Sequence, residues 1–340
     1  MIFLKLFKVL LHRIYILVFF IVFSSCDKEI EVNVGLSATQ LVVEGYIQQE
    51  YPAYVFLTRS ENYFNEVSAN TIDNISVKDA EVFVERNDGI IHKLTYLSNN
   101  ILDSLPDFDT FMLPLNGLYL DMNYQQDQFS QIGYKYKLHI YWNGDTITSS
   151  TSIPPQYPID SVWVESKDTI EDLFKCYIWA RINDPDTANN SMLVHYKRDL
   201  GWKPMDSLFI PTAISLRSDK LLNGESYEAF YSRSGRFDEE DGVLLPFNGD
   251  RVVDGEFVQK DIVMLRISHI DYDSYKFWRS VERSQSTNGN PFAEPMNLFS
   301  NIDGGLGIWG GYGVSYFYIP IIPDTVIYDT YNDVGVFEIF

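Results

Sequence analysis

The sequence predicts a mainly β protein, in which an N-terminal immunoglobulin-like antiparallel sandwich is followed by a second β-rich domain containing one aromatic-faced helix. Three observations predict this fold class. Short runs of alternating apolar and polar residues recur, glycine-containing turn pairs join several of them, and 23 Tyr, 23 Phe and 6 Trp supply a core. β-Branched and aromatic residues favour strands, and Asn-Gly pairs favour hairpin turns.

The first 25 residues are typical of a lipoprotein signal peptide. Three basic residues precede an unbroken apolar run over residues 14–23, and Ser24 and Ser25 lead to Cys26. Secretory signals have this order of charged head, apolar middle and small residues before the cleavage site. A membrane span needs about 20 apolar residues, so an uncleaved anchor is less favoured, as is a secreted soluble form. We expect Cys26 to begin the mature chain and to carry acyl chains that hold it on a bilayer.

The chain is strongly acidic, with a formal net charge of −21 that becomes about −24 once the three basic residues of the leader are removed. Binding to nucleic-acid phosphates needs clustered Lys and Arg, so nucleic acid is not an expected partner. An anionic membrane surface would repel this chain, which makes a covalent lipid the suitable attachment. Solubility alone also explains the acidity.

Cys26 and Cys176 are the only cysteines in the sequence. Because Cys26 is committed to lipid, we expect no intramolecular disulfide. Cys176 lies in an alternating run over residues 174–179, where it is expected to be a small buried hydrophobe rather than a reactive thiol.

A charged tether over residues 26–35 leads into the first expected domain, residues 36–153. The turn sequences Asn87-Asp88-Gly89 and Asn143-Gly144 predict two hairpins. The clearest strand covers residues 134–141, because its large apolar residues fall on one face and its two lysines and its histidine on the other. The strands expected in this domain are 41–47, 53–59, 81–86, 90–96, 134–141 and 145–149.

Three prolines between positions 154 and 158 predict a stiff connector, which we place at residues 154–160. The second expected domain is residues 161–340. Its helix has Asp271 or Asp273 as N-cap, runs to about Ser286 and presents one apolar face. The expected strands are 161–165, 177–182, 191–196 and 258–270, and the apolar helix face consists of Tyr275, Phe277, Trp278 and Val281.

No motif in the sequence predicts a particular chemistry. The histidines outside the leader are scattered, and the sequence has no His-Glu-x-x-His pair, no Cys-x-x-Cys pair, no Gly-x-Ser-x-Gly elbow and no Gly-x-x-x-x-Gly-Lys loop. We therefore expect no cofactor, no metal and no enzymatic activity. A hydrolase whose Ser-His-Asp triad is dispersed along the chain is the remaining catalytic alternative.

Two acidic stretches and one glycine-rich stretch have competing interpretations. Residues 183–190 present oxygen ligands at alternating positions, as a calcium loop does, but a turn built from Asp, Pro and Asn is favoured. Residues 237–242 hold four carboxylates, and a solvated loop is favoured over a cation site. The third stretch, residues 301–313, is rich in glycine. We favour glycines that allow positive φ or close backbone approach beside Trp309 and Tyr312 over a nucleotide site.

The C-terminal region also has a family likeness. Residues 288–295, Asn-Gly-Asn-Pro-Phe-Ala-Glu-Pro, and residues 300–312, Ser-Asn-Ile-Asp-Gly-Gly-Leu-Gly-Ile-Trp-Gly-Gly-Tyr, resemble the signature of a Bacteroidota lipoprotein family called domain of unknown function 4249. Residues 41–47 and 57–60 resemble the opening strands of the same family. The likeness covers the whole mature chain.

The resemblance implies an outer-membrane lipoprotein whose relatives are often encoded beside TonB-dependent receptors, and it supplies no catalytic residues. Asp27-Lys28-Glu29 is similar to the lysine-plus-acid signal that sends such lipoproteins to the cell surface. We expect a non-catalytic surface protein that is an accessory or ligand-capture partner of a TonB-dependent transporter, with its ligand unknown. The alternative is a structural or assembly lipoprotein facing the periplasm.

Candidate binding residues come from the family-like segment. We expect residues 288–313 to pack beside the aromatic helix, with Phe292 and Trp309 in the core unless they contact ligand directly. The candidate binding or family-motif residues are Asn290, Pro291, Phe292, Glu294, Pro295, Asn301, Gly304, Gly305 and Gly307.

Overall fold

The computed structural model describes most of the chain from Thr39 onward. The described residues are 39–61, 74–97, 117–157, 159–170, 173–199, 209–220, 223–231, 237–238, 243–244, 249–253, 256–257, 262–287, 297–320 and 325–327. The expected signal peptide, the tether and Cys26 to Glu29 lie outside them, as do residues 288–296. The described chain belongs to one compact unit that begins at Thr39.

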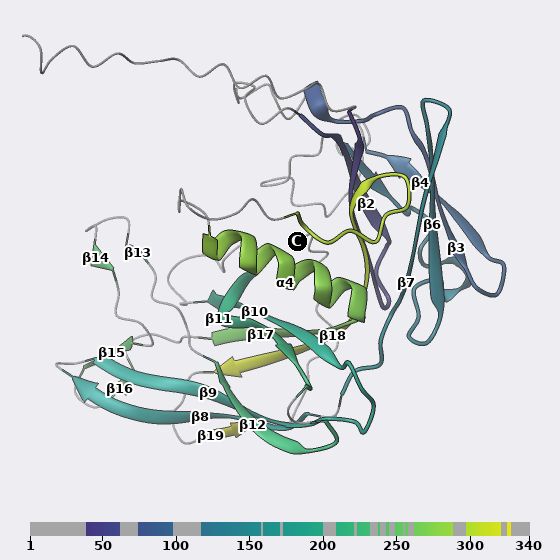
Figure 1. The fold of residues 1–340 in the computed structure, drawn as a ribbon. Coiled ribbons are helices and arrows are strands. Elements are labelled where there is room, and N and C mark those ends of the chain that lie inside the picture. The colour runs from purple at the N-terminus through teal and green to yellow at the C-terminus, as the bar shows by residue number, and fades with distance from the viewer. Residues whose placement is uncertain are drawn as a thin grey trace, which may run out of the picture. The chain divides into compact units, whose positions relative to one another are not determined.

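Two large sheets and the long helix α4 dominate the described part of the fold, which confirms the predicted mainly β class (Figure 1). The larger sheet has the order β11-β10-β17-β18-β1-β2-β5-β4-β3-β6-β7. Its strands are β1 (Leu41–Gln48), β2 (Tyr54–Arg59), β3 (Glu81–Arg86), β4 (Ile91–Tyr96), β5 (Leu118–Leu120), β6 (Lys135–Trp142), β7 (Asp145–Ser152), β10 (Ser191–Asp199), β11 (Ile210–Ser218), β17 (Ile262–Ile270) and β18 (Leu306–Pro320).

The smaller sheet has the order β16-β15-β9-β8-β19, with β12 also paired to β9, and β13 pairs with β14 separately. Besides the helical residues 74–75, the described chain contains the short 3₁₀ helix η1 (Gln126–Gln128) and the helix α4 (Tyr272–Thr287). The remaining strands are β8 (Ile159–Ile170), β9 (Leu173–Asn183), β12 (Ser226–Tyr231), β13 (Phe237–Asp238), β14 (Val243–Leu244), β15 (Gly249–Val253), β16 (Glu256–Phe257) and β19 (Thr325–Ile327).

The N-terminal strands form a sandwich around one apolar core. Residues 91–94 of β4 pair with β3, whereas Thr95 and Tyr96 pair with β5, so β4 joins the two halves. Side chains from β1 and β2 meet side chains from β3 and β6 in a single cluster. The alternation predicted for β6 is confirmed, because Tyr136, Leu138 and Ile140 are fully buried. Asn143 and Gly144 both have positive φ, 51° and 87°, as the predicted hairpin turn requires.

The strand pairing crosses the boundary predicted between the two domains. β18 pairs with β1 in parallel, from Val42 opposite Leu306 to Gln48 opposite Tyr312. Every other neighbouring pair in this sheet is antiparallel. The division at residues 154–160 stays a prediction. Separating the two predicted domains would require breaking the hydrogen bonds between β1 and β18.

The C-terminal half has three layers (Figure 1). One face of β10, β17 and β18 packs on β8, β9 and β12, where the core includes Val164, Ile178 and Leu265. The opposite face lies under α4, whose Tyr275, Phe277 and Trp278 side chains pack there. These three residues belong to the apolar helix face that the sequence predicts. Helix α4 therefore covers the sheet on the side away from the smaller sheet.

Asp271 is the N-cap of α4, which confirms one of the two predicted caps. Its Oδ1 accepts a hydrogen bond from the Ser274 backbone N–H at 2.8 Å, and its Oδ2 accepts one from the Thr151 hydroxyl at 2.6 Å. Burial raises the pKa of the Asp271 carboxyl, and the two hydrogen bonds oppose that shift. The cap thus connects the start of α4 to β7 in the N-terminal sandwich.

His269 on β17 is fully buried and bonded on both ring nitrogens. Nδ1 lies 3.1 Å from the Gly313 carbonyl oxygen, and Nε2 accepts a hydrogen bond from the Tyr157 backbone N–H at 3.3 Å. This arrangement fits the neutral ring with its proton on Nδ1. Burial lowers the pKa of His269 to about 4, and the bond to Gly313 opposes that shift.

A pH dependence of stability follows from His269. The unfolded chain takes up a proton near pH 6.5, whereas the folded chain does so near pH 4. Between these values stability falls as pH falls, by up to about 1.4 kcal/mol per pH unit. We expect His269→Asn to be less stable at pH 7 and to lose this part of the slope. Urea unfolding at pH 7.0, 5.5 and 4.5 measures it, and an unchanged slope in the variant would contradict the assignment.

Candidate ligand-binding site

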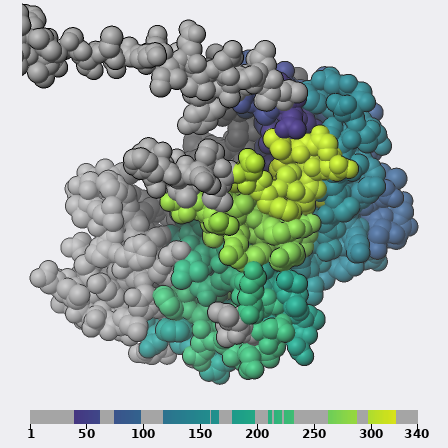
Figure 2. All heavy atoms as spheres, in the orientation of Figure 1, coloured from purple at the N-terminus to yellow at the C-terminus, as the bar shows by residue number. Residues whose placement is uncertain are grey.

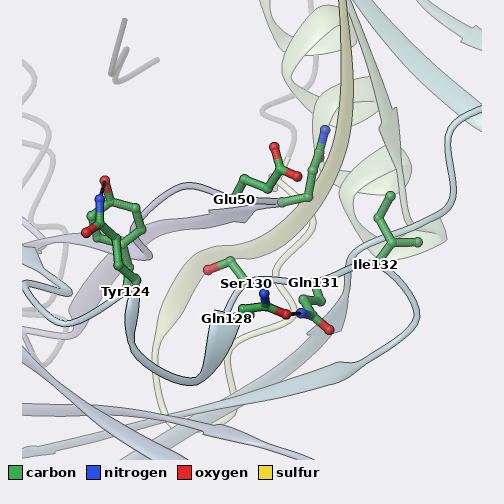
Figure 3. A pocket seen from close by; sticks show the side chains of 8 residues that line it. Glu50, Tyr124, Gln128, Ser130, Gln131 and Ile132 are labelled. Carbon is green, nitrogen blue, oxygen red and sulfur yellow. Dashed lines mark hydrogen bonds between the residues drawn. The ribbon is translucent and has the colours of Figure 1, made fainter. Parts of the chain in front are cut away.

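A cavity of about 580 Å³ opens where the end of β1 faces the loop that follows β5. This volume lies within the roughly 300–1,000 Å³ of small-molecule sites. Figure 3 shows Tyr124 and Ile132 at opposite ends of the space, Glu50 on one side, and Gln128 and Gln131 on the other. The lining residues are Gln49, Glu50, Tyr124, Gln125, Gln128, Ser130, Gln131 and Ile132.

Arg86 at the end of β3 fixes the loop that forms one wall of the cavity. Its Nη1 donates to the backbone carbonyl oxygens of Asp127, Gln128 and Phe129 at 3.2, 2.9 and 3.0 Å. Its Nε donates to Asp88 at 2.9 Å, and its guanidinium lies 4.6 Å from the centre of the Tyr134 ring. Charge-assisted hydrogen bonds to three successive carbonyls hold η1 and the residue after it in one conformation.

Two further contacts hold the same loop. The Tyr136 hydroxyl lies 2.9 Å from the Phe129 carbonyl oxygen and accepts a hydrogen bond from the Gln131 backbone N–H at 2.7 Å. At the start of the loop, the buried Asp121 carboxylate lies 2.7 Å from His92 Nδ1. The His92 ring stacks on Phe129 at 3.8 Å. His92 and Asp121 are therefore positioning residues for this loop.

The backbone around the cavity has an uncommon conformation. Glu50, Asp127 and Gln128 have positive φ, of 65°, 58° and 45°. Residues other than glycine seldom adopt this region, and such residues cluster at binding sites because the surrounding structure has to hold them there. The Glu50 backbone N–H donates to the Ser130 carbonyl oxygen at 2.8 Å, which joins the two walls.

A buried polar network lies behind the cavity, at the end of β1. Arg266 Nη2 donates to Gln48 Oε1 at 2.8 Å, and Gln48 Nε2 donates to the Tyr316 hydroxyl at 3.3 Å. Tyr51 follows the lining residue Glu50. Burial raises the pKa of the Tyr51 hydroxyl, with Tyr316 adding to the shift and Arg266 opposing it. The wall formed by residues 48–51 is therefore connected to β17 and β18.

The predicted candidate Asn301 lies away from this cavity and pairs with Trp309. Its Oδ1 accepts from the Trp309 backbone N–H at 2.9 Å, and its Nδ2 donates to the Trp309 carbonyl oxygen at 2.8 Å. Trp309 is fully buried, as the sequence predicts, and its indole N–H donates to the Tyr136 carbonyl oxygen at 3.1 Å. Asn301 thus stabilises the position of a core side chain.

The candidate glycines allow the chain to approach neighbouring backbone. Gly304 and Gly307 have positive φ, 84° and 111°. A Cβ on Gly305 would lie 2.9 Å from the Leu41 carbonyl oxygen, and one on Gly307 would overlap Val43. Positive φ and close approach were the favoured interpretation for these glycines. The chain turns at Gly304, and from Leu306 onward it forms the long strand β18.

The described part of the family-like segment packs along α4, as the sequence predicts. The Phe299 backbone N–H donates to Ser280 Oγ at 2.9 Å, and the Lys276 ammonium lies 4.1 Å from the centre of the Phe299 ring. The Trp278 indole N–H donates to the Tyr312 hydroxyl at 2.8 Å. In Figure 2 the yellow atoms of this segment lie between the purple atoms of β1 and the green atoms of α4.

The other candidate residues lie outside the described residues, so their expected roles stay predictions. These residues are Cys26, Asp27, Lys28, Glu29, Asn290, Pro291, Phe292, Glu294 and Pro295.

The acidic stretch at residues 183–190 is a hydrogen-bonded turn between β9 and β10. Asp184 Oδ2 accepts from the Gly224 backbone N–H at 3.1 Å, and the Asn190 backbone N–H donates to Asp219 at 3.0 Å. Burial raises the pKa of the Asp184 carboxyl. Within the described ranges, no group of three or more His, Cys, Asp or Glu could hold a metal ion. For residues 237–242, only the backbone of β13 is described.

The four histidines of the described residues lie in strands: His92 in β4, His139 in β6, His195 in β10 and His269 in β17. Burial lowers the pKa of His195 to about 3, and the nearby Arg266 adds to the shift. Cys176 lies in β9, as expected from the alternating run. No helix of the described chain is long and apolar enough to cross a membrane.

A family model described as "Domain of unknown function (DUF4249)" matches residues 27–316. The chain belongs to this family. A search of curated proteins finds no match. The DUF4249 match includes β1, the loop at residues 123–132, α4 and most of β18, so both walls of the cavity lie within the family domain.

One stretch of the sequence, not among the predicted candidates, indicates this cavity. Residues 123–131 read Asn-Tyr-Gln-Gln-Asp-Gln-Phe-Ser-Gln, in which four of nine residues are glutamine. Such a polar loop with an aromatic residue, between two predicted strands, is a candidate binding loop. Its position opposite Glu50 depends on the pairing of β2 with β5, which the local pattern does not indicate.

Proposed function

We propose that this DUF4249 protein is a non-catalytic, lipid-anchored protein of the outer membrane that captures a ligand for a TonB-dependent transporter at the cell surface. The cavity beside Glu50 is the observation that carries ligand capture, because its loop is fixed by Arg86 and Tyr136 before any ligand arrives. A preorganised wall avoids the entropy cost of ordering the loop on binding.

The proposed location is supported by the N-terminal residues. The basic head, the apolar run and Ser24-Ser25-Cys26 favour a lipidated cysteine, and Asp27-Lys28-Glu29 favours the outer leaflet. Two or more acyl chains hold a protein on a bilayer, at about 0.8 kcal/mol per buried methylene. The transporter partnership is supported by the family resemblance.

Membrane attachment and transporter binding can be tested together. We expect the native protein, extracted gently from membranes, to co-isolate with a β-barrel receptor and to incorporate labelled palmitate. Cys26→Ser should lose both the label and the membrane fraction almost completely, while Cys176→Ser should keep both. Mass spectrometry identifies the co-isolated protein. Recovery of the native protein alone, or of Cys26→Ser in membranes, would argue against the proposal.

A structural or assembly role on the periplasmic side is the second candidate function. The charged segment after Cys26 and the tie between the sandwich and α4 through Asp271 are also compatible with a rigid envelope component. Protease treatment of intact cells separates the two. Cleavage of the protein supports the surface location, and full protection supports the periplasmic one.

A further inference from the structure

The cavity presents many hydrogen-bonding groups and little charge. Four of its eight lining residues are glutamines, and Tyr124 and Ser130 add two hydroxyls. An amide and a hydroxyl each both donate and accept hydrogen bonds. Glu50 is the only charged residue of the lining, and Ile132 is its only large aliphatic one. A ligand that matches this wall is neutral and rich in hydrogen-bonding groups.

The lining amides are held by neighbouring groups and keep capacity for a ligand. Gln131 Nε2 donates to Gln128 Oε1 at 2.9 Å, and Gln125 Nε2 donates to the Tyr124 hydroxyl at 3.1 Å. Each bond uses one hydrogen-bonding position of an amide that has several. Gln49 is different, because both ends of its amide bond the Val314 backbone, at 2.6 and 2.8 Å. Gln49 therefore positions the wall, whereas the three other glutamines face the ligand space.

Ser130 is an independent sign of a ligand at this site. Its side chain lines the cavity and the residue is 3% exposed, yet its Oγ has no hydrogen-bond partner in the described structure. Buried hydroxyls are usually bonded, and an unbonded one is destabilising. Ser130 Oγ is closed to solvent in this structure, so a ligand hydroxyl would remove this cost once the Ser130 side chain turns toward it.

We propose that the cavity binds a neutral saccharide, an inference that rests on the ligand-capture function proposed above. Adjacent hydroxyls of a sugar ring match the paired donors and acceptors of Gln125, Gln128 and Gln131. The Glu50 carboxylate accepts from ring hydroxyls, and the face of the Tyr124 ring receives the apolar face of the sugar.

Two other ligand classes fit the site less well. An anionic sugar or a phosphate compound would place its charge against the Glu50 carboxylate. Peptide sites use a free strand edge or apolar pockets for anchor side chains. Ile132 is the only large aliphatic lining side chain, and β1 is already paired on both sides, with β2 and β18.

Binding is tested with the full mature chain and defined probes. The probes are glucose, galactose, mannose, N-acetylglucosamine, maltose, cellobiose and lactose, with glucuronate and triglycine as the competing classes. Saturation-transfer NMR detects contact, and calorimetry gives Kd. The matched variants are Gln125→Ala and Gln126→Ala, because these neighbouring glutamines differ in that Gln126 does not line the cavity. Tyr124→Ala tests the stacking surface.

We expect at least one neutral sugar to bind, about three- to tenfold more weakly to Gln125→Ala and at least about tenfold more weakly to Tyr124→Ala. Gln126→Ala should bind like the wild type. Failure of every neutral probe, tighter binding of glucuronate or triglycine, or sugar binding unchanged in both cavity variants would overturn the proposal. Co-isolation of the receptor is measured separately. A failed saccharide test would therefore overturn the saccharide proposal without deciding whether the protein binds a transporter.

Discussion

Replacing Gly307 with alanine is expected to destabilise the protein by about 3 kcal/mol or more. Gly307 has a φ of 111°, a conformation that costs alanine about 1–2 kcal/mol. An added Cβ would also press on the Val43 carbonyl group, with its carbon 2.8 Å away, in the strand that pairs with β18. The backbone of two paired strands cannot move apart without losing hydrogen bonds. Urea unfolding measures the loss.

Gly89→Ala is the matched control for this substitution. Gly89 also has a positive φ, 94°, but a Cβ there would have no atom within 4 Å. We expect Gly89→Ala to lower the free energy of unfolding only by the cost of positive φ, about 1–2 kcal/mol. The difference between the two variants measures the overlap with Val43. Equal losses would contradict the close packing of β1 against β18.

Arg86→Met is expected to lower stability by about 2–4 kcal/mol and to loosen the cavity wall. Methionine keeps much of the aliphatic volume but cannot donate to the carbonyls of Asp127, Gln128 and Phe129. Those residues would then lose the contact that holds the positive φ of Gln128. Hydrogen exchange of residues 123–132, together with urea unfolding, measures the effect.

Arg181→Met provides the control, because Arg181 forms an ion pair with Glu228 in which both side chains are about half exposed. Exposed ion pairs contribute little to stability, so no measurable change is expected. Unchanged hydrogen exchange of residues 123–132 in Arg86→Met would show that Arg86 does not hold the loop.

The parts of the fold that the sequence predicted are those set by local pattern. Alternation over residues 134–141, the turn at Asn143-Gly144 and the cap at Asp271 each depend on residues close together in the chain. The structure confirms them because no distant contact opposes the local preference. Strand β18 was not predicted as a strand, since its glycines lower strand propensity. Its pairing with β1 stabilises the extended conformation instead.

The site was harder to predict than the fold. Asn301 was predicted as a binding residue because it is a polar residue in the family-like segment. Its side-chain amide instead forms hydrogen bonds with the backbone of Trp309. The cavity combines Glu50 with residues 124–132, about 80 positions apart, and these meet only after β2 has paired with β5. Sequence periodicity reports on one element at a time, so it cannot show which loops meet.

The parallel contact between Val42 and Leu306 also affects how the molecule reaches its native state. Sequence separation of this size gives a high contact order, which slows folding because a large loop has to close first. During synthesis, β1 emerges long before β18 exists, and the edge of β1 that pairs with β18 remains unpaired meanwhile. Such an edge invites association with other chains. We therefore expect the nascent chain to be prone to association with other chains until β18 has been synthesised.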